Sequence, residues 1–299
     1  MRRLVPIVVA LAVAAAGCGG QRNAAVERSP WTPIGGTLSG AVDPRSANIC
    51  NRGGIRCIDA VVAEMVRRFA PLARDCDHRA AFALMYLRVT QAVGQEEKHG
   101  ALLADRAYLS HLDALFARLY FTAADDWALG RHGEVPRAWQ IAFEAAQQRR
   151  ASGIGDLLLG MNAHISRDLP FAVASIGFRP GGGGASEERA FGQVNQLLTA
   201  VQDSILREES RRFDPTIGTF TLPVLKVDAA SVALLIDKWR DAALRDGLRL
   251  LRARTSAHRA AVVQSIEDNA TARAAIIFAA TSRVPFSKAG KARDRFCNH

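Results

Sequence analysis

From residue 58 onward, apolar positions recur at intervals of three and four residues, which is the spacing of amphipathic helices. The segment 157–176 is apolar nearly all round and therefore predicts a central, buried helix. Pro170 lies inside this segment and predicts a kink or a helix end near Leu169. The pattern as a whole predicts helices over residues 58–69, 82–93, 103–120, 136–143, 157–176, 191–205, 232–254 and 262–278.

Two stretches interrupt the helical pattern. Residues 178–184 are rich in glycine and predict a flexible loop. Residues 213–226 contain two prolines and a glycine among threonine and apolar residues, which predicts an extended crossover, a short hairpin or a lid over a pocket. The expected fold is therefore all-α, a single multi-helix domain of bundle-like architecture with few strands.

The N-terminus has the features of an export signal. Two arginines precede an uncharged run from Leu4 to Ala16, which is too short to cross a bilayer as a helix. Residues 15–18, Ala-Ala-Gly-Cys, resemble a lipobox, although Ala15 stands where leucine is usual. We expect residues 1–17 to be a lipoprotein signal peptide and Cys18 to carry the lipid that anchors the exported protein to the cell membrane. The alternative is an ordinary signal followed by an incidental cysteine.

Composition divides the rest of the chain into two parts. Residues 18–48 are rich in Gly, Ser and Pro without periodicity, and they predict a flexible tether. Residues 49–299 form the expected helical domain, which ends in a basic C-terminal tail. This tail contributes to a formal net charge of +10. It either contacts anionic lipid or cell-wall polymer or is simply solvated. No recognition motif indicates nucleic acid as a partner.

The chain has five cysteines, so four remain if Cys18 is acylated. An even number in an exported domain predicts two disulfides, for which three pairings exist. The sequence between Cys50 and Cys57 contains Asn-Arg-Gly-Gly, which can turn the chain back and favours that pair. The remaining pair, Cys76 and Cys297, would fasten the C-terminus to the helical body.

The central apolar helix carries the most informative polar residues. His164 and Asp168 are four residues apart and so share one helix face. Asn162 is on a different face. Because buried polar groups need partners, we expect three residues of other predicted helices to approach the pair; they are Asp113, Tyr120 and Asn195.

Three interpretations of this polar cluster stay open. His164 and Asp168 can be ligands of a divalent metal, since histidine and carboxylates on facing helices bind zinc or iron. They can instead be a metal-free site, either for acid–base catalysis, with Asp168 tuning His164, or for a small molecule. The third interpretation is a structural polar network that fixes helix register. The chain has no G-x-S-x-G, H-E-x-x-H or phosphate-binding glycine motif.

The order of these motifs resembles a bacterial family, domain of unknown function 5995. The residues that carry the resemblance are Leu112-Asp113, Phe116, Tyr120, Trp127, Arg137-Ala138-Trp139, Phe143, Leu158 to His164, and Asp168-Leu169. The resemblance covers roughly residues 58 to 280 and implies a helical fold, but that family brings no assigned activity.

A second, weaker resemblance is to secreted zinc phospholipases and nucleases, which are helical and carry an H-x-x-x-D ligand pair. Those sites need more histidines and use a free mature N-terminus, so the resemblance implies at most a reduced mono- or dinuclear site. The function expected from the sequence is a cell-envelope lipoprotein with a buried polar pocket around His164 and Asp168. Its role would be the binding of a small-molecule or envelope ligand, or purely structural. The alternative is a metal-dependent, phosphoesterase-like hydrolase that uses these two residues.

Overall fold

The computed structural model describes residues 38, 40–177, 184–219, 221–222, 227–228, 231–282, 293–294 and 296–297. Within these ranges the chain is almost entirely helical, which confirms the predicted all-α, bundle-like fold. The elements in chain order are α1 (Arg56–Arg74), α2 (Ala80–His99), α3 (Arg106–Ala128), η1 (His132–Glu134), α4 (Arg137–Gln147), α5 (Gly153–Asn162), η2 (Ala163–Asp168), α6 (Leu169–Ile176), α7 (Ala185–Arg212), η3 (Ile217–Thr219), β1 (Thr221–Leu222), β2 (Val227–Asp228), α8 (Val232–Arg252) and α9 (Ser256–Thr281).

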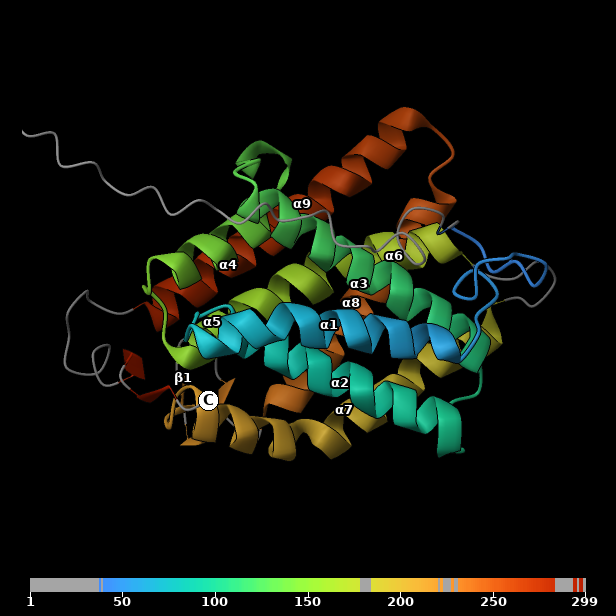
Figure 1. Ribbon diagram of the computed structural model, residues 1–299. Coiled ribbons are helices and arrows are strands. Elements are labelled where there is room, and N and C mark those ends of the chain that lie inside the picture. Colours follow the sequence, from blue (N-terminus) through green and yellow to red (C-terminus); the bar gives the residue numbers. More distant parts are fainter. Residues whose placement is uncertain are drawn as a thin grey trace, which may run out of the picture.

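The helices surround the run formed by α5, η2 and α6. Figure 1 shows α1, α2 and α7 side by side on one side of the molecule, with α3 beside α1. Helices α4 and α9 pack against α5, whereas α8 packs against α6 and η2. The central run is thus enclosed by helices on several sides, as its nearly uniform apolar composition predicts.

A kink or a helix end was expected near Leu169, and the second of these alternatives, a helix end, is wrong. The helix passes through a π-helical segment, η2, and continues as α6 to Ile176, where Gly177 takes a positive φ of 63°. Pro170 lies in the first turn of α6, where a missing N–H is tolerated. A π-helical insertion of this kind is rare and is frequently found at functional sites.

Side-chain caps define where several helices begin. Asp105 accepts a hydrogen bond from the Tyr108 N–H at the start of α3, and Ser152 does the same for the Gly155 N–H at the start of α5. Thr255 caps α9 through the His258 N–H. Each cap satisfies a backbone donor that has no partner within its helix.

The interrupted segment after α7 contains a short hairpin, one of the three alternatives expected. Strand β1 pairs antiparallel with β2 through Thr221–Asp228 and Leu222–Val227. Most of the predicted glycine-rich loop, residues 178–183, lies outside the described part of the chain.

Cys18 and the predicted signal peptide also lie outside the described residues. The described end of the expected tether packs against the helical body. Leu38 is buried, and a Cβ atom at Gly40 would lie 2.2 Å from the Ser175 carbonyl oxygen of α6. Arg118 of α3 donates a hydrogen bond to the Leu38 carbonyl. The folded body therefore begins before residue 49, earlier than composition indicates.

The four remaining cysteines pair as expected. Cys50 is bonded to Cys57 and Cys76 to Cys297, with Cα–Cα distances of 4.9 and 5.8 Å. The second disulfide brings the C-terminal segment to the start of α2. Arg293 of the expected solvated tail is buried there and bonded to Asp156. Among the described helices, none combines the length and apolar character that a membrane span requires.

Candidate functional site

His164 and Asp168 meet in the buried centre of the molecule. Both lie on η2, and the Nδ1 atom of His164 is 3.3 Å from Oδ2 of Asp168. Their exposed fractions are 3% and 0%, so neither side chain contacts bulk solvent appreciably. The predicted shared helix face is therefore correct, although the local geometry is π-helical rather than α-helical.

Asp168 accepts further hydrogen bonds from two residues that the sequence did not single out as its partners. The Trp139 indole Nε1 donates to Oδ2 over 2.8 Å, and the Arg167 Nη1 donates to Oδ1 over 3.0 Å. Arg167 also donates through Nε to Glu267 of α9 over 2.8 Å. A buried carboxylate is stable as an anion when cationic and N–H donors surround it in this way. Asp168 is thus a fixed acceptor for His164.

The imidazole of His164 lies in an aromatic cage. It stacks on Phe116 with ring centroids 3.4 Å apart and planes within 7° of parallel. The Tyr86 ring centroid is 4.3 Å away, and the Tyr120 centroid is 6.1 Å away. Burial lowers the pKa of His164 below its ordinary value, although the hydrogen bond with Asp168 acts in the opposite direction. The neutral imidazole is therefore favoured at neutral pH.

The hydrogen bond to Asp168 defines the tautomer of a neutral His164. An ionised carboxylate only accepts hydrogen bonds, so Nδ1 carries the proton and Nε2 is left with a lone pair. The Nε2 atom is buried and has no hydrogen-bond partner among the described residues, and the same holds for the Tyr86 hydroxyl. Burying such groups without a partner is costly, which makes them candidate contacts for a ligand.

A hollow adjoins these two atoms. It has an empty volume of about 670 Å³, including the part that is open to solvent. Side chains from α2, α3, α5, η2, α7 and α8 line it, and most of them are apolar. The lining residues used below are Met85, Tyr86, Val89, His164, Leu198 and Arg240. We call this hollow the central pocket.

A second hollow of about 480 Å³ adjoins the central pocket and shares Tyr86, Val89, Phe116, Leu198 and Arg240 with it. Asp113 of α3 lines this side hollow but does not line the central pocket. Burial raises the pKa of Asp113 to about 7. Asp113 is therefore near the site, as expected, but it is not a hydrogen-bond partner of His164 or Asp168 in the described structure.

Arg240 of α8 connects Asn195 to the pocket. Its Nε donates to the Asn195 Oδ1 over 2.6 Å, and its Nη2 donates to the Phe191 carbonyl oxygen over 3.1 Å. Burial lowers the pKa of Arg240 to about 10. Asn195 thus positions a cation at the pocket instead of contacting His164 directly. Arg240 could not be identified from the sequence, because arginines are frequent in the chain and this one lies in an otherwise amphipathic pattern.

Asn162 does not belong to the site. Its amide donates over 2.8 Å to the Ala270 carbonyl oxygen of α9, on another side of the central run. This placement agrees with the expectation that Asn162 and His164 lie on different faces.

The donor set is a poor fit for a metal ion. Across the part of the chain that the structure describes, no group of three or more His, Cys, Asp and Glu side chains is arranged to hold one. Both oxygens of Asp168 already accept hydrogen bonds, and one of these oxygens, Oδ2, is also the partner of the His164 Nδ1. Only the His164 Nε2 is left as a free donor atom for a cation.

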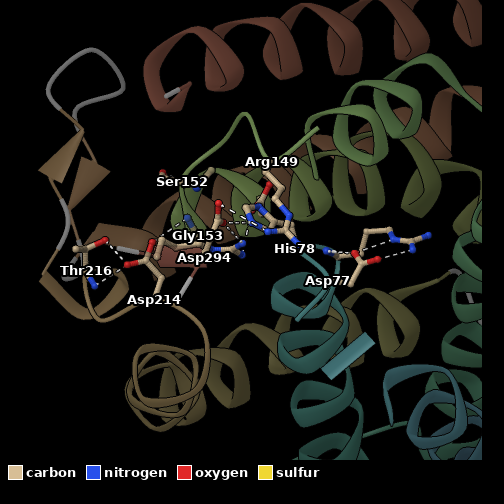
Figure 2. A network of polar contacts seen from close by, with 12 residues as sticks. Asp77, His78, Arg149, Ser152, Gly153, Asp214, Thr216 and Asp294 are labelled. Carbon is tan, nitrogen blue, oxygen red and sulfur yellow. Dashed lines mark hydrogen bonds and ion pairs between the residues drawn. The ribbon is translucent and has the colours of Figure 1, made fainter. Parts of the chain in front are cut away.

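A second polar cluster, shown in Figure 2, lies between the start of α2 and the C-terminal segment. The His78 Nδ1 is 2.8 Å from Oδ2 of Asp156, and its Nε2 is 2.9 Å from Oδ1 of Asp294. Arg293 Nη2 is 3.4 Å from the same Asp156 oxygen. This cluster was not predicted from the sequence, although the expected pairing of Cys76 with Cys297 implies that residues near these two cysteines lie close together.

The family model for DUF5995, a family of unknown function, matches residues 58–280. That range contains every residue of the His164 site and every residue that lines the central pocket. No curated protein and no solved structure matches the chain. The extent of the match shows that the chain belongs to the DUF5995 family.

Proposed function

We propose that the protein is a binding protein for a small, largely apolar molecule that carries a polar group, and that the central pocket is its binding site. The observation that carries the proposal is a pair of buried polar atoms without a partner among the described residues, the His164 Nε2 and the Tyr86 hydroxyl, in side chains that line a mostly apolar hollow. Ligand sites are typically concave, lined mostly by apolar side chains, and carry a few placed polar groups. The central pocket has this character.

The polar atoms of the pocket wall indicate which polar group the ligand carries. The neutral His164 accepts a hydrogen bond at Nε2, so a ligand hydroxyl or amide N–H is the matching group. The Tyr86 hydroxyl both donates and accepts. The hydrogen bonds of Asp168 to Trp139, Arg167 and His164 hold the imidazole in place before any ligand arrives. Such preorganisation reduces the entropic cost of binding.

Dodecanol is a suitable neutral probe, because it combines an apolar chain with one hydroxyl. We expect saturable binding in calorimetric titrations, with a negative heat-capacity change that reports apolar burial. Val89→Phe fills the wall shared by both hollows and is expected to abolish binding. Val66→Phe is the matched control, since Val66 is 45% exposed on α1. Binding of neither dodecanol nor its carboxylate analogue dodecanoate to the unmodified protein, or equal binding of dodecanol by both variants, would overturn the proposal.

Hydrolysis is a second candidate, favoured by the orientation of His164. A pocket-lining histidine that is held by a buried carboxylate at Nδ1, and whose Nε2 has no partner among the described residues, is suited to act as a general base. The chromogenic ester p-nitrophenyl dodecanoate tests this candidate with and without added zinc. Turnover that His164→Gln abolishes supports hydrolysis, and zinc dependence would favour the metal-dependent form. No turnover under either condition rejects it.

We also propose that the domain is held outside the cytoplasm by a lipid on Cys18. The lipobox-like residues 15–18 support this proposal, and so do the two disulfides, because disulfides form and persist in oxidising compartments. The expected result is that the protein fractionates with membranes and that Cys18→Ala moves it to the soluble extracytoplasmic fraction. Unchanged fractionation of Cys18→Ala would contradict the anchor.

A further inference from the structure

Arg240 is a buried cation on the wall of the central pocket, with an exposed fraction of 7%. Its guanidinium packs over the Phe191 ring, with Cζ 4.3 Å from the ring centroid. Asn195 and the Phe191 carbonyl fix it through Nε and Nη2. The side chain is therefore held in one orientation by an aromatic face and two neutral acceptors.

The hydrogen bonds of Arg240 leave part of its guanidinium unused. A guanidinium has five N–H donors, and Asn195 and the Phe191 carbonyl occupy one each. The Nη1 atom has no acceptor among the described residues. Its edge, formed by Nη1 and Nη2, is the one that binds a carboxylate through two parallel hydrogen bonds.

The charge of Arg240 also has no partner in contact. Within the described ranges, no carboxylate lies within ion-pair distance of this guanidinium. Asp237 and Asp241 of the same helix act on it only at longer range, and burial lowers its pKa to about 10. Among the described residues, the other buried arginine, Arg293, has such a partner, because its Nη2 lies 3.4 Å from an oxygen of Asp156. A buried cation without a paired anion is costly, so an anionic ligand would offset that cost.

We propose that the natural ligand of the central pocket is an amphipathic monocarboxylate, with its carboxylate on Arg240, its apolar chain in the pocket and a hydroxyl or amide N–H for the His164 Nε2. This inference rests on the proposed binding function. The apolar chain would lie among side chains such as Met85, Leu157 and Leu198. Asp113 would repel a carboxylate, but it lines only the side hollow and is absent from the central pocket.

Tyr86 strengthens the assignment. It lines both hollows together with Arg240, and its hydroxyl is buried without a partner in the described structure. A hydroxyl in the lining that also contains Arg240 is a second kind of donor for an anionic head group. Charge-assisted hydrogen bonds of this type are roughly twice as strong as neutral ones.

The test compares dodecanoate with dodecanol, which differ in head-group charge but share the apolar chain. We expect dodecanoate to bind the unmodified protein at least about tenfold more tightly, which corresponds to about 1.4 kcal/mol. Arg240→Gln is expected to lower the dodecanoate affinity by at least about tenfold more than the dodecanol affinity, so that the preference for dodecanoate is lost. Arg273→Gln is the matched control, because Arg273 also lies over an aromatic ring and bonds to a neutral acceptor but does not line the pocket.

The outcomes separate the two levels of the proposal. Equal affinities for dodecanoate and dodecanol, or a preference for dodecanoate that survives in Arg240→Gln, would overturn the carboxylate assignment and leave the binding function standing. Binding of neither probe would overturn the binding function itself. If Arg240→Gln fails to fold, Arg240→Lys provides the second variant. It keeps the charge but lacks the bidentate edge, and it is expected to weaken dodecanoate binding more than dodecanol binding.

Discussion

At the scale of single residues, Asp168 organises the site. Its carboxylate accepts hydrogen bonds from Trp139 and Arg167 and lies on the Nδ1 of His164. Because Asp168 is fully buried, its charge is tolerated only while these donors surround it. The same contacts orient the imidazole of this pocket-lining residue, and its Nε2 has no partner among the described residues. Stability and binding geometry therefore depend on one carboxylate.

Asp168→Asn removes that charge and leaves Arg167 partly uncompensated. Breaking one partner of a buried ion pair typically costs about 3–5 kcal/mol, so we expect the free energy of unfolding to fall by about 3 kcal/mol in denaturant titrations. Asp246→Asn is the control, since the pair of Asp246 with Arg249 lies at the surface. Surface pairs contribute up to about 1 kcal/mol. A loss for Asp168→Asn no larger than that of the control would contradict this role.

Buried carboxyl groups such as Glu97 make stability depend on pH. Burial raises the pKa of Glu97 to about 9, and Asp113 contributes in the same direction. An acid whose pKa is higher in the folded than in the unfolded state binds more protons when folded. Its stabilising contribution is therefore present below about pH 4.5 and is lost as the pH rises toward about 9.

Glu97→Gln is expected to reduce this loss. The slope of unfolding free energy against pH for one such group reaches at most about 1.4 kcal/mol per pH unit. Denaturant titrations between pH 5 and pH 9 should therefore show a shallower decline for Glu97→Gln than for the unmodified protein. Identical slopes in the two proteins would show that Glu97 titrates normally in the folded state.

At the scale of elements, the site depends on a close approach between α2 and α5. A Cβ atom at Gly160 would lie 2.4 Å from the Phe82 ring, which in turn packs edge-on against His164. Glycine is thus required at this position of α5 by the aromatic cage rather than by backbone conformation.

Gly160→Ala is expected to destabilise the protein by about 1–3 kcal/mol, because overpacking a core forces neighbouring side chains from their rotamers. Gly192→Ala is the matched control in α7, where nothing lies within 4 Å of the added methyl group. There, alanine should stabilise the helix by about 0.5–1 kcal/mol. Thermal unfolding measures the change in stability of both variants, which is expected to be a loss for Gly160→Ala and a gain for Gly192→Ala. A stabilised Gly160→Ala would refute the close packing.

Much of the element pattern could be predicted from sequence, and the reason is periodicity. The apolar stripes of α1, α2 and α8 follow helical spacing, so their positions follow from the sequence alone. The continuation of the central helix through Pro170 could not be predicted, because the π-helical segment that precedes this proline has no periodic signature in the sequence. Likewise, Trp139 reaches Asp168 across 29 residues of chain, a contact that depends on tertiary packing.

The site was predictable only in part for the same reason. His164 and Asp168 lie four residues apart on one element, so their contact follows from local geometry. The partners Arg167, Glu267 and Arg240 come from helix crossings that no local pattern encodes. Asn195 illustrates this limit. Its helix was correctly expected to lie near the site, but its side chain bonds to Arg240 and not to His164 or Asp168.

At the scale of the whole molecule, the disulfide between Cys76 and Cys297 closes a separation of 221 residues. It holds Arg293 and Asp294 against His78 and Asp156. The other disulfide, between Cys50 and Cys57, spans only 7 residues. On loop-closure entropy, the long-range disulfide is expected to contribute more to the free energy of unfolding, about 5 kcal/mol, than the short-range disulfide, about 2 kcal/mol.

Replacement of each cysteine pair by serine tests this difference. The double variant Cys76→Ser/Cys297→Ser is expected to lose more unfolding free energy than Cys50→Ser/Cys57→Ser in the same denaturant. A larger loss for the short-range pair would contradict the entropic account and show that local strain or packing dominates.

The central claim is that the pocket beside His164 is a binding site for an amphipathic carboxylate. The most direct measurement is photo-crosslinking with a dodecanoate that carries a diazirine in its chain, followed by mass-spectrometric mapping of the labelled residues. The account predicts labels on pocket residues such as Met85, Leu198 and Ile236, and their loss in Val89→Phe. Labels confined to the outer surface, or unchanged labelling in Val89→Phe, would contradict it.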